Sequence, residues 1–125
     1  MSNAKQRFRD LKVWSEGVEL ARAVYRLTAE FPLEERFGLT AQLRRAAVSV
    51  PSNIAEGSVR RSRRHFCQFL ETALGSLAEM ETQLEIADDM SRNRALRGDV
   101  ELRVARVRRM LYRLYSVLET SDQSR

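Results

Sequence analysis

The feature that most constrains this chain is a helical spacing of apolar residues, which recurs in four separate segments. In residues 39–57 the apolar side chains follow one another at steps of three or four positions. That spacing puts them on one side of an α-helix. The stripe consists of Leu39, Leu43, Ala47, Val50 and Ile54. Because the 125 residues include only 2 Pro and 5 Gly, little in the chain interrupts helices of this kind.

Four amphipathic helices are predicted, over about residues 11–29, 39–56, 63–90 and 99–119. The short joins between them favour an all-α fold, an antiparallel up-down-up-down four-helix bundle that forms a single domain over residues 1–125. In the first helix the main apolar seam is expected at Trp14, Val18, Ala21, Tyr25 and Thr28. A second apolar row widens that seam, at Val13, Leu20, Val24, Leu27 and Phe31.

The helix boundaries are predicted from residues that start or stop helices. Pro32 ends the first helix, since proline restricts the residue before it. Gly57 is expected at the C′ position that ends the second helix. Ser62 and Asp99 are expected to cap the third and fourth helices, with residues 92–98 forming a loop.

The second helix also carries a row of polar residues and an internal proline. Pro51 costs about 3 kcal/mol in a helix interior, because it lacks an N–H and crowds the preceding turn. The polar row consists of Gln42, Arg45, Ser49, Asn53 and Glu56. We expect a hydrogen-bonded seam between helices or between protomers, with a small-ligand or nucleotide site as the alternative. Arg45 and Glu56 lie too far apart to pair within one straight helix, but they can pair across an interface.

Three stretches of the chain resemble a known family. They are FRDLKVW at residues 8–14, QLRRAAVSVPSNIAEG at residues 42–57 and FLETALGSLAEMETQLEIA at residues 69–87. Together they resemble the 23S rRNA-intervening-sequence proteins, relatives of the accessory variability determinant proteins of diversity-generating retroelements. The resemblance implies an antiparallel four-helix protomer and a ring-like homopentamer. The retroelement relatives have basic surfaces that bind nucleic acid and a reverse transcriptase.

Positive charge is the main functional signal in the composition. The formal net charge is +5 and the isoelectric point is about 10.1. Among the 22 basic residues only Lys5 and Lys12 are lysines. The planar guanidinium of arginine suits bidentate contacts with phosphate or carboxylate. Residues 44–64 and 92–113 are rich in arginine, whereas residues 65–91 contain acids and neither Lys nor Arg.

Two groups of arginines are candidates for contact with nucleic acid. The first group, at the join of the second and third helices, is Arg60, Arg61, Arg63 and Arg64. The second group, opposite the apolar seam of the fourth helix, is Arg106, Arg109 and Arg113. They predict binding to RNA or DNA through the phosphate backbone, without base readout. In the alternative interpretation the acidic third helix pairs with its basic neighbours and only sets helix register.

No catalytic or metal-binding pattern stands out. His65 is the only histidine, and Cys67, the only cysteine, is expected in the core. The protein is therefore expected to be non-enzymatic, with no cofactor and no metal. The spacing of Arg60 and His65 keeps a HEPN-like ribonuclease as a remote alternative, because a histidine can act as general acid or base on RNA. A protein-interaction scaffold with no role in nucleic-acid binding is the main alternative.

The expected partners are other copies of the chain, nucleic acid, and a reverse transcriptase or another protein. No apolar run approaches the 18 residues that a membrane-spanning helix needs, so no membrane association is expected. Residues 1–7 contain no signal-peptide core, and a cytoplasmic location is expected.

Overall fold

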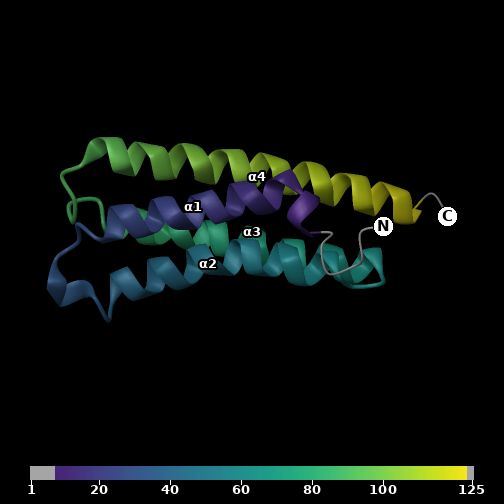
Figure 1. Ribbon diagram of the computed structural model, residues 1–125, viewed down its shortest axis with the longest axis horizontal. Helices are drawn as coiled ribbons and strands as arrows, with labels where there is room; N and C mark the ends of the chain where they lie inside the picture. Colours follow the sequence, from purple (N-terminus) through teal and green to yellow (C-terminus); the bar gives the residue numbers. More distant parts are fainter. Residues whose placement is uncertain (1–7, 124–125) are drawn as a thin grey trace.

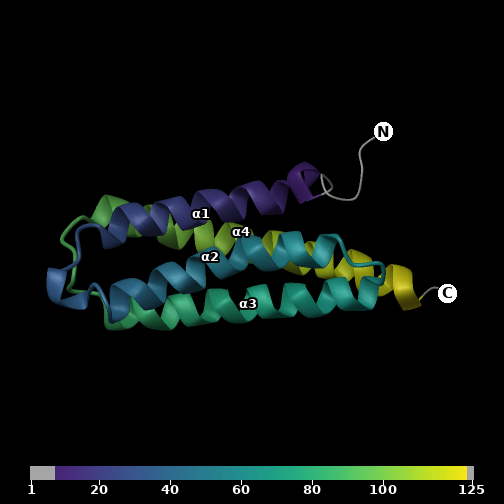
Figure 2. The same cartoon turned by 60° about the horizontal axis from the view of Figure 1, so that its bottom comes forward.

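The computed structural model describes residues 8–123 and contains four long α-helices in that range. They are α1 (Lys12–Thr28), α2 (Leu39–Ser58), α3 (Arg63–Ile86) and α4 (Arg94–Gln123), with a short 3-10 helix η2 (Leu33–Glu35) between α1 and α2. Successive helices run in opposite directions along the bundle (Figures 1 and 2). α1 and α3 each pack against both α2 and α4. The predicted all-α fold is confirmed.

All four helices contribute to one apolar core. The largest side chains that are fully buried in it are Leu20, Val24, Leu27, Leu43, Val50, Ile54, Leu70, Leu77, Met80, Val100, Val107 and Leu111. Burying each such side chain stabilises the fold by about 1.5–3 kcal/mol. In α1 the second row, not the predicted main seam, lies deepest in the core. Tyr25 of the predicted seam is 43% exposed, whereas Leu20 and Val24 are at 0%.

Close approach of α2 to its neighbours depends on two glycines. Gly17 of α1 lies against Pro51 of α2, where an added Cβ would be 3.4 Å from the proline Cβ. Gly57 of α2 is buried against α3, and a Cβ there would be only 2.7 Å from the Cβ of Phe69. The prediction that Gly57 ends α2 at a C′ position is wrong, because α2 continues to Ser58 and no described glycine has a positive φ.

The start of α4 also differs from the prediction. α4 begins at Arg94, five residues before Asp99. The cap is Asn93, whose side-chain oxygen accepts a hydrogen bond from the backbone N–H of Leu96 at 3.0 Å. Residues 94–98 are therefore helical and not part of a loop. At the start of α3 the predicted cap is confirmed, since Ser62 Oγ accepts from the N–H of His65 at 3.1 Å. α3 ends at Ile86, earlier than the predicted residue 90.

Candidate nucleic-acid interface

The first group of arginines surrounds the turn between α2 and α3. Arg60, Arg61, Arg63 and Arg64 are all exposed. The Arg60 guanidinium lies 5.0 Å from the centre of the Phe69 ring and 3.9 Å from a Glu56 carboxylate oxygen. Among the described residues, Arg61 and Arg63 form no ion pair. Their charge is therefore open to an external anion.

The second group lies on α4, and one of its three arginines is paired with an acid whereas the other two are not. Arg106, Arg109 and Arg113 are exposed. Arg106 Nη1 donates to Glu16 Oε1 of α1 at 3.0 Å, so a carboxylate of the same chain already compensates its charge. Arg109 and Arg113 form no ion pair within residues 8–120. The open part of this group is thus the pair nearest the C-terminal end of α4.

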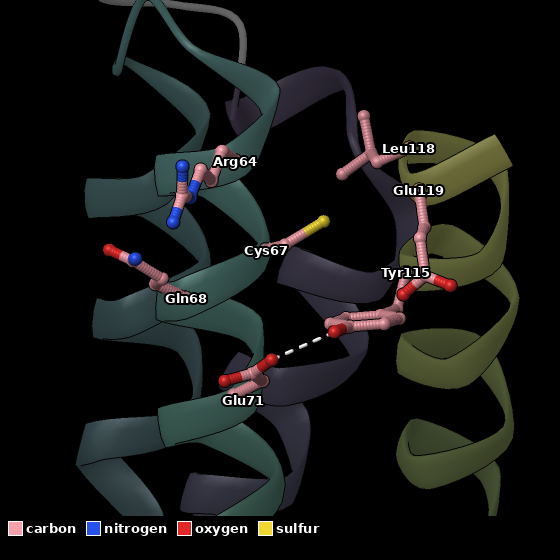
Figure 3. Close-up of a pocket in the computed structure, with 7 residues that line it drawn as sticks. All are labelled: Arg64, Cys67, Gln68, Glu71, Tyr115, Leu118 and Glu119. Atoms are coloured by element: carbon pink, nitrogen blue, oxygen red, sulfur yellow. Dashed lines mark hydrogen bonds between the residues drawn. The ribbon is translucent and has the colours of Figure 1, made fainter. Parts of the chain in front are cut away.

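The open arginines of both groups belong to the same half of the bundle, since Arg61 and Arg63 flank the turn between α2 and α3 and Arg109 and Arg113 lie between the middle and the C-terminal end of α4. The turn between α2 and α3 and the C-terminal half of α4 are at the same end in Figures 1 and 2. Arg64 of α3 and Tyr115 and Glu119 of α4 line one hollow of about 430 Å³, which places the two helix segments side by side (Figure 3). Sequence spacing alone could not bring the two groups together.

An aromatic cluster that the sequence analysis did not single out lies around the start of α1, in the same half of the bundle (Figures 1 and 2). Phe8 and Trp14 pack edge to face, with ring centres 5.1 Å apart. The Arg9 guanidinium lies 5.3 Å from the Phe8 ring centre and 5.8 Å from that of Trp14. Such cation–π contacts orient an exposed guanidinium without neutralising it. We call the seven residues together the arginine end: Arg9, Arg60, Arg61, Arg63, Arg64, Arg109 and Arg113.

The hollow in Figure 3 has acidic groups on both sides. Tyr115 Oη donates to Glu71 Oε1 at 2.8 Å. That hydrogen bond, together with burial and the nearby charges of Glu71 and Glu119, raises the pKa of Tyr115 to about 12. The Cys67 sulfur points into this space, so Cys67 is half-buried at the hollow and not in the core as predicted. The two carboxylates make this hollow a poor site for phosphate.

Other arginines of α4 pair with acids at the α3 side. Arg108 bonds to Glu81 of α3. Arg97, which is buried, lies 3.6 Å from Asp88 and 3.8 Å from Glu101. Of these pairs only Arg108–Glu81 joins α4 to the acidic third helix, as the alternative interpretation expects, since Asp88 lies beyond the end of α3 and Glu101 is on α4 itself. That interpretation does not account for Arg109 and Arg113.

The polar row of α2 is divided between the interior and the surface. Ser49 Oγ and Ser76 Oγ of α3 are hydrogen-bonded at 2.5 Å. Asn53 Nδ2 donates to the Ser49 carbonyl oxygen at 2.7 Å and to Ser49 Oγ at 3.1 Å. The serine pair joins α2 to α3 of one protomer, and the two Asn53 hydrogen bonds lie within α2. Gln42, Arg45 and Glu56 are exposed.

The residues of the remote catalytic alternative are placed as follows. His65 is exposed in the first turn of α3, and Arg60 is engaged with Phe69 and Glu56. In the described part of the chain no three His, Cys, Asp or Glu side chains gather as metal ligands would. Nor does any described helix have the length and apolar character needed to cross a membrane.

The family model described as 23S rRNA-intervening sequence protein matches residues 9–113. Because this match covers most of the chain, the protein belongs to that family. Comparison with curated proteins gives no match.

Proposed function

We propose that this member of the 23S rRNA-intervening sequence protein family is a non-enzymatic protein that binds RNA or DNA through its arginine end. The observation that carries the proposal is the group of exposed arginines without acidic partners, Arg61, Arg63, Arg109 and Arg113, in one half of the bundle. A cytoplasmic location is part of the same proposal.

The arrangement favours contacts with the phosphate backbone. A guanidinium is more weakly hydrated than an ammonium group, so it gives up less solvation energy when it meets a phosphate, and its planar fork matches two phosphate oxygens. Nothing in the sequence resembles a helix-turn-helix, zinc-finger or RNA-recognition motif that would read bases. Binding is therefore expected to depend on salt and to depend little on sequence.

We further propose that the protein acts as a homo-oligomer, which the family resemblance implies to be a pentamer. Large apolar side chains at the end of the bundle opposite the turn between α2 and α3 support self-association without covering Arg109 and Arg113, because Leu33 is 69% exposed and Ile86 62%. Repetition of the arginine end around a ring would raise the local positive charge and give several contacts to one nucleic-acid strand. Light scattering coupled to size-exclusion chromatography measures the number of protomers.

A fluorescence-anisotropy titration with RNA and DNA at several salt concentrations tests nucleic-acid binding. With about five phosphates neutralised per protomer, the affinity for duplex DNA should fall several hundred-fold between 50 mM and 200 mM salt. Absence of binding at 50 mM salt, or affinity that is indifferent to salt, would refute the proposal. Incubation of the wild type and of His65→Ala with labelled RNA tests the non-enzymatic part. We expect intact RNA with both proteins.

The exposed apolar side chains of α4, Leu102, Tyr112 and Val117, favour a second candidate function, a scaffold that holds a partner protein in place of nucleic acid. Because the family resemblance extends to retroelement accessory proteins only as relatives of the family, a reverse transcriptase is proposed as the first partner to test. A pull-down that captures a partner after nuclease treatment, in combination with no salt-dependent binding of RNA or DNA, would favour the scaffold.

A further inference from the structure

The face formed by α1 and α2 carries two adjoining hollows away from the arginine end. One, of about 430 Å³, is lined by arginines and is called here the arginine hollow: Tyr25, Arg36, Thr40, Ala41, Arg44, Arg45 and Val48. The other, of about 390 Å³, is called here the apolar hollow: Val18, Ala21, Arg22, Tyr25, Arg26, Val48, Pro51 and Ser52. They share Tyr25 and Val48, so they form one continuous surface.

The arginine hollow has uncompensated positive charge. Arg36, Arg44 and Arg45 line it together with no carboxylate, and none of the three forms an ion pair within residues 8–120. The hollows on the other side of the bundle differ in this respect. The one beside Arg64 also has Glu71 and Glu119 in its lining. The one beside Arg97 has three glutamates, Glu81, Glu85 and Glu101.

One of the three guanidinium groups is held in place before any ligand arrives. Arg44 Nε donates to Thr28 Oγ1 at 2.8 Å, and its Nη2 donates to the Tyr25 carbonyl oxygen at 3.5 Å. Its guanidinium carbon lies 4.4 Å from the centre of the Tyr25 ring. These contacts use part of the guanidinium fork and fix its orientation, so little rotamer entropy remains to be lost when an anion binds.

The apolar hollow continues the surface on the other side of Tyr25. Its two arginines are already engaged, since Arg22 Nη1 lies 2.8 Å from Glu19 and Arg26 Nη2 lies 3.8 Å from Asp99. The part of the lining that can still contact a ligand is apolar and consists of Val18, Ala21, Val48 and Pro51. A ligand that spans both hollows must therefore have a compact anionic head and a flat or apolar body.

We propose that this face binds a nucleotide, with the phosphate monoester at Arg36, Arg44 and Arg45 and the base in the apolar hollow beside Tyr25. The dianionic phosphate suits three cationic forks, and bases pack on aromatic and arginine planes in many proteins. The nucleotide can be free or can be the phosphorylated end of a strand, because both present the same chemistry. This inference goes beyond the proposed function, which concerns backbone phosphates at the other end of the bundle.

Isothermal titration calorimetry with adenosine 5′-monophosphate tests the inference on the full chain. We expect a dissociation constant between about 10 µM and 1 mM, because the two hollows are shallow. Adenosine, which lacks the phosphate, should bind at least about tenfold more weakly. Absence of binding at about 5 mM nucleotide, or equal affinity for adenosine, would overturn the proposal. Comparison of 5′-phosphorylated and 5′-hydroxyl oligonucleotides then shows whether a strand end is accepted as well as the free nucleotide.

Two arginine variants show whether the nucleotide binds at this site or only to the positive charge of the protein as a whole. Arg45→Gln removes an exposed side chain without an ion-pair partner, so the fold should be kept and the affinity for the nucleotide should fall about tenfold. Arg109→Gln removes the same charge at the arginine end and should leave that affinity unchanged. Equal loss with both variants would overturn the inference. The proposed function is tested separately, since Arg109→Gln should weaken binding of long RNA.

Discussion

The packing of α2 against α3 predicts that substitution by alanine changes the free energy of unfolding in opposite directions at two glycines, Gly57 and Gly75. Gly57 is buried in α2, and a Cβ placed on it would lie 2.7 Å from Phe69 Cβ, 2.9 Å from Phe66 Cδ1 and 3.3 Å from the Phe66 carbonyl oxygen. Gly75 is exposed in the middle of α3, and a Cβ placed on it would meet nothing within 4 Å. Substitution by alanine therefore tests the helix contact at one position and helix propensity alone at the other.

The expected magnitudes follow from these distances. Alanine in place of glycine gains about 1 kcal/mol of helix propensity at either position. At Gly57 the helices must move apart, because Phe69 Cβ is fixed to the α3 backbone and cannot rotate away, and a contact as short as 2.7 Å puts the cost of overpacking in the upper part of its range, about 2–3 kcal/mol. The α2–α3 contact would also be disturbed over neighbouring turns. We expect Gly57→Ala to lower the free energy of unfolding by about 1–2 kcal/mol and Gly75→Ala to raise it by about 0.5–1 kcal/mol.

Urea unfolding followed by circular dichroism, at equal protein concentration for the three proteins, measures both changes. If Gly57→Ala is as stable as the wild type or more stable, α2 and α3 do not approach as closely as the structure places them. Equal stabilisation by both substitutions would mean that propensity alone decides, and the argument from packing would be refuted.

Three further predictions concern charge, titration and capping. Arg113→Gln should reduce the slope of log affinity against log salt by about 1, whereas Arg94→Gln, whose arginine is paired with Asp88 at 3.3 Å, should not change that slope in an anisotropy titration. In a spectrophotometric titration of the phenols Tyr115 should ionise near pH 12, and Tyr115→Phe should remove this late phase. The folded state holds the Tyr115 proton more tightly than the unfolded state, so the contribution of Tyr115 to the free energy of unfolding is complete below pH 10 and is lost as the pH rises through 12. Asn93→Ala should cost about 1 kcal/mol in urea unfolding and more than Asp99→Ala, because Asn93 caps α4 whereas Asp99 pairs with Arg103 at the surface.

The helices could be predicted because their apolar periodicity is strong, but their ends could not all be predicted. Gly98 followed by Asp99 resembles a loop and a cap, yet both lie inside α4. A glycine costs a helix only about 1 kcal/mol, and Arg97 links this first part of α4 to Asp88 and Glu101. Asn93 is itself a favoured cap residue, so a signal for the correct start was present in the sequence.

The direction of the charged side chains could be predicted, but their partners could not. Helical spacing put Arg106, Arg109 and Arg113 on the outer side of α4, where all three are exposed. The ion pair of Arg106 with Glu16 joins residues that are far apart in the sequence, and no local pattern indicates it. For the same reason no local pattern indicates that the segment around Arg9 at the start of α1 is in the same half of the bundle as the turn between α2 and α3 (Figures 1 and 2).

The two proposed surfaces should respond differently to salt, and the reason lies in α1. Two apolar rows run along this helix, and in the bundle the row with Leu20 and Val24 fills the core. The other row leaves Tyr25 exposed beside Val48, so the arginine hollow has an apolar neighbour.

A nucleotide bound there has a single phosphate group, and part of its binding energy comes from burial of the base, which salt does not screen. Its affinity should therefore fall less than about tenfold between 50 mM and 200 mM salt, while that of long RNA falls far more steeply. Equal salt slopes for adenosine 5′-monophosphate and RNA would mean that both ligands are held by charge alone, and that the apolar hollow takes no part in binding.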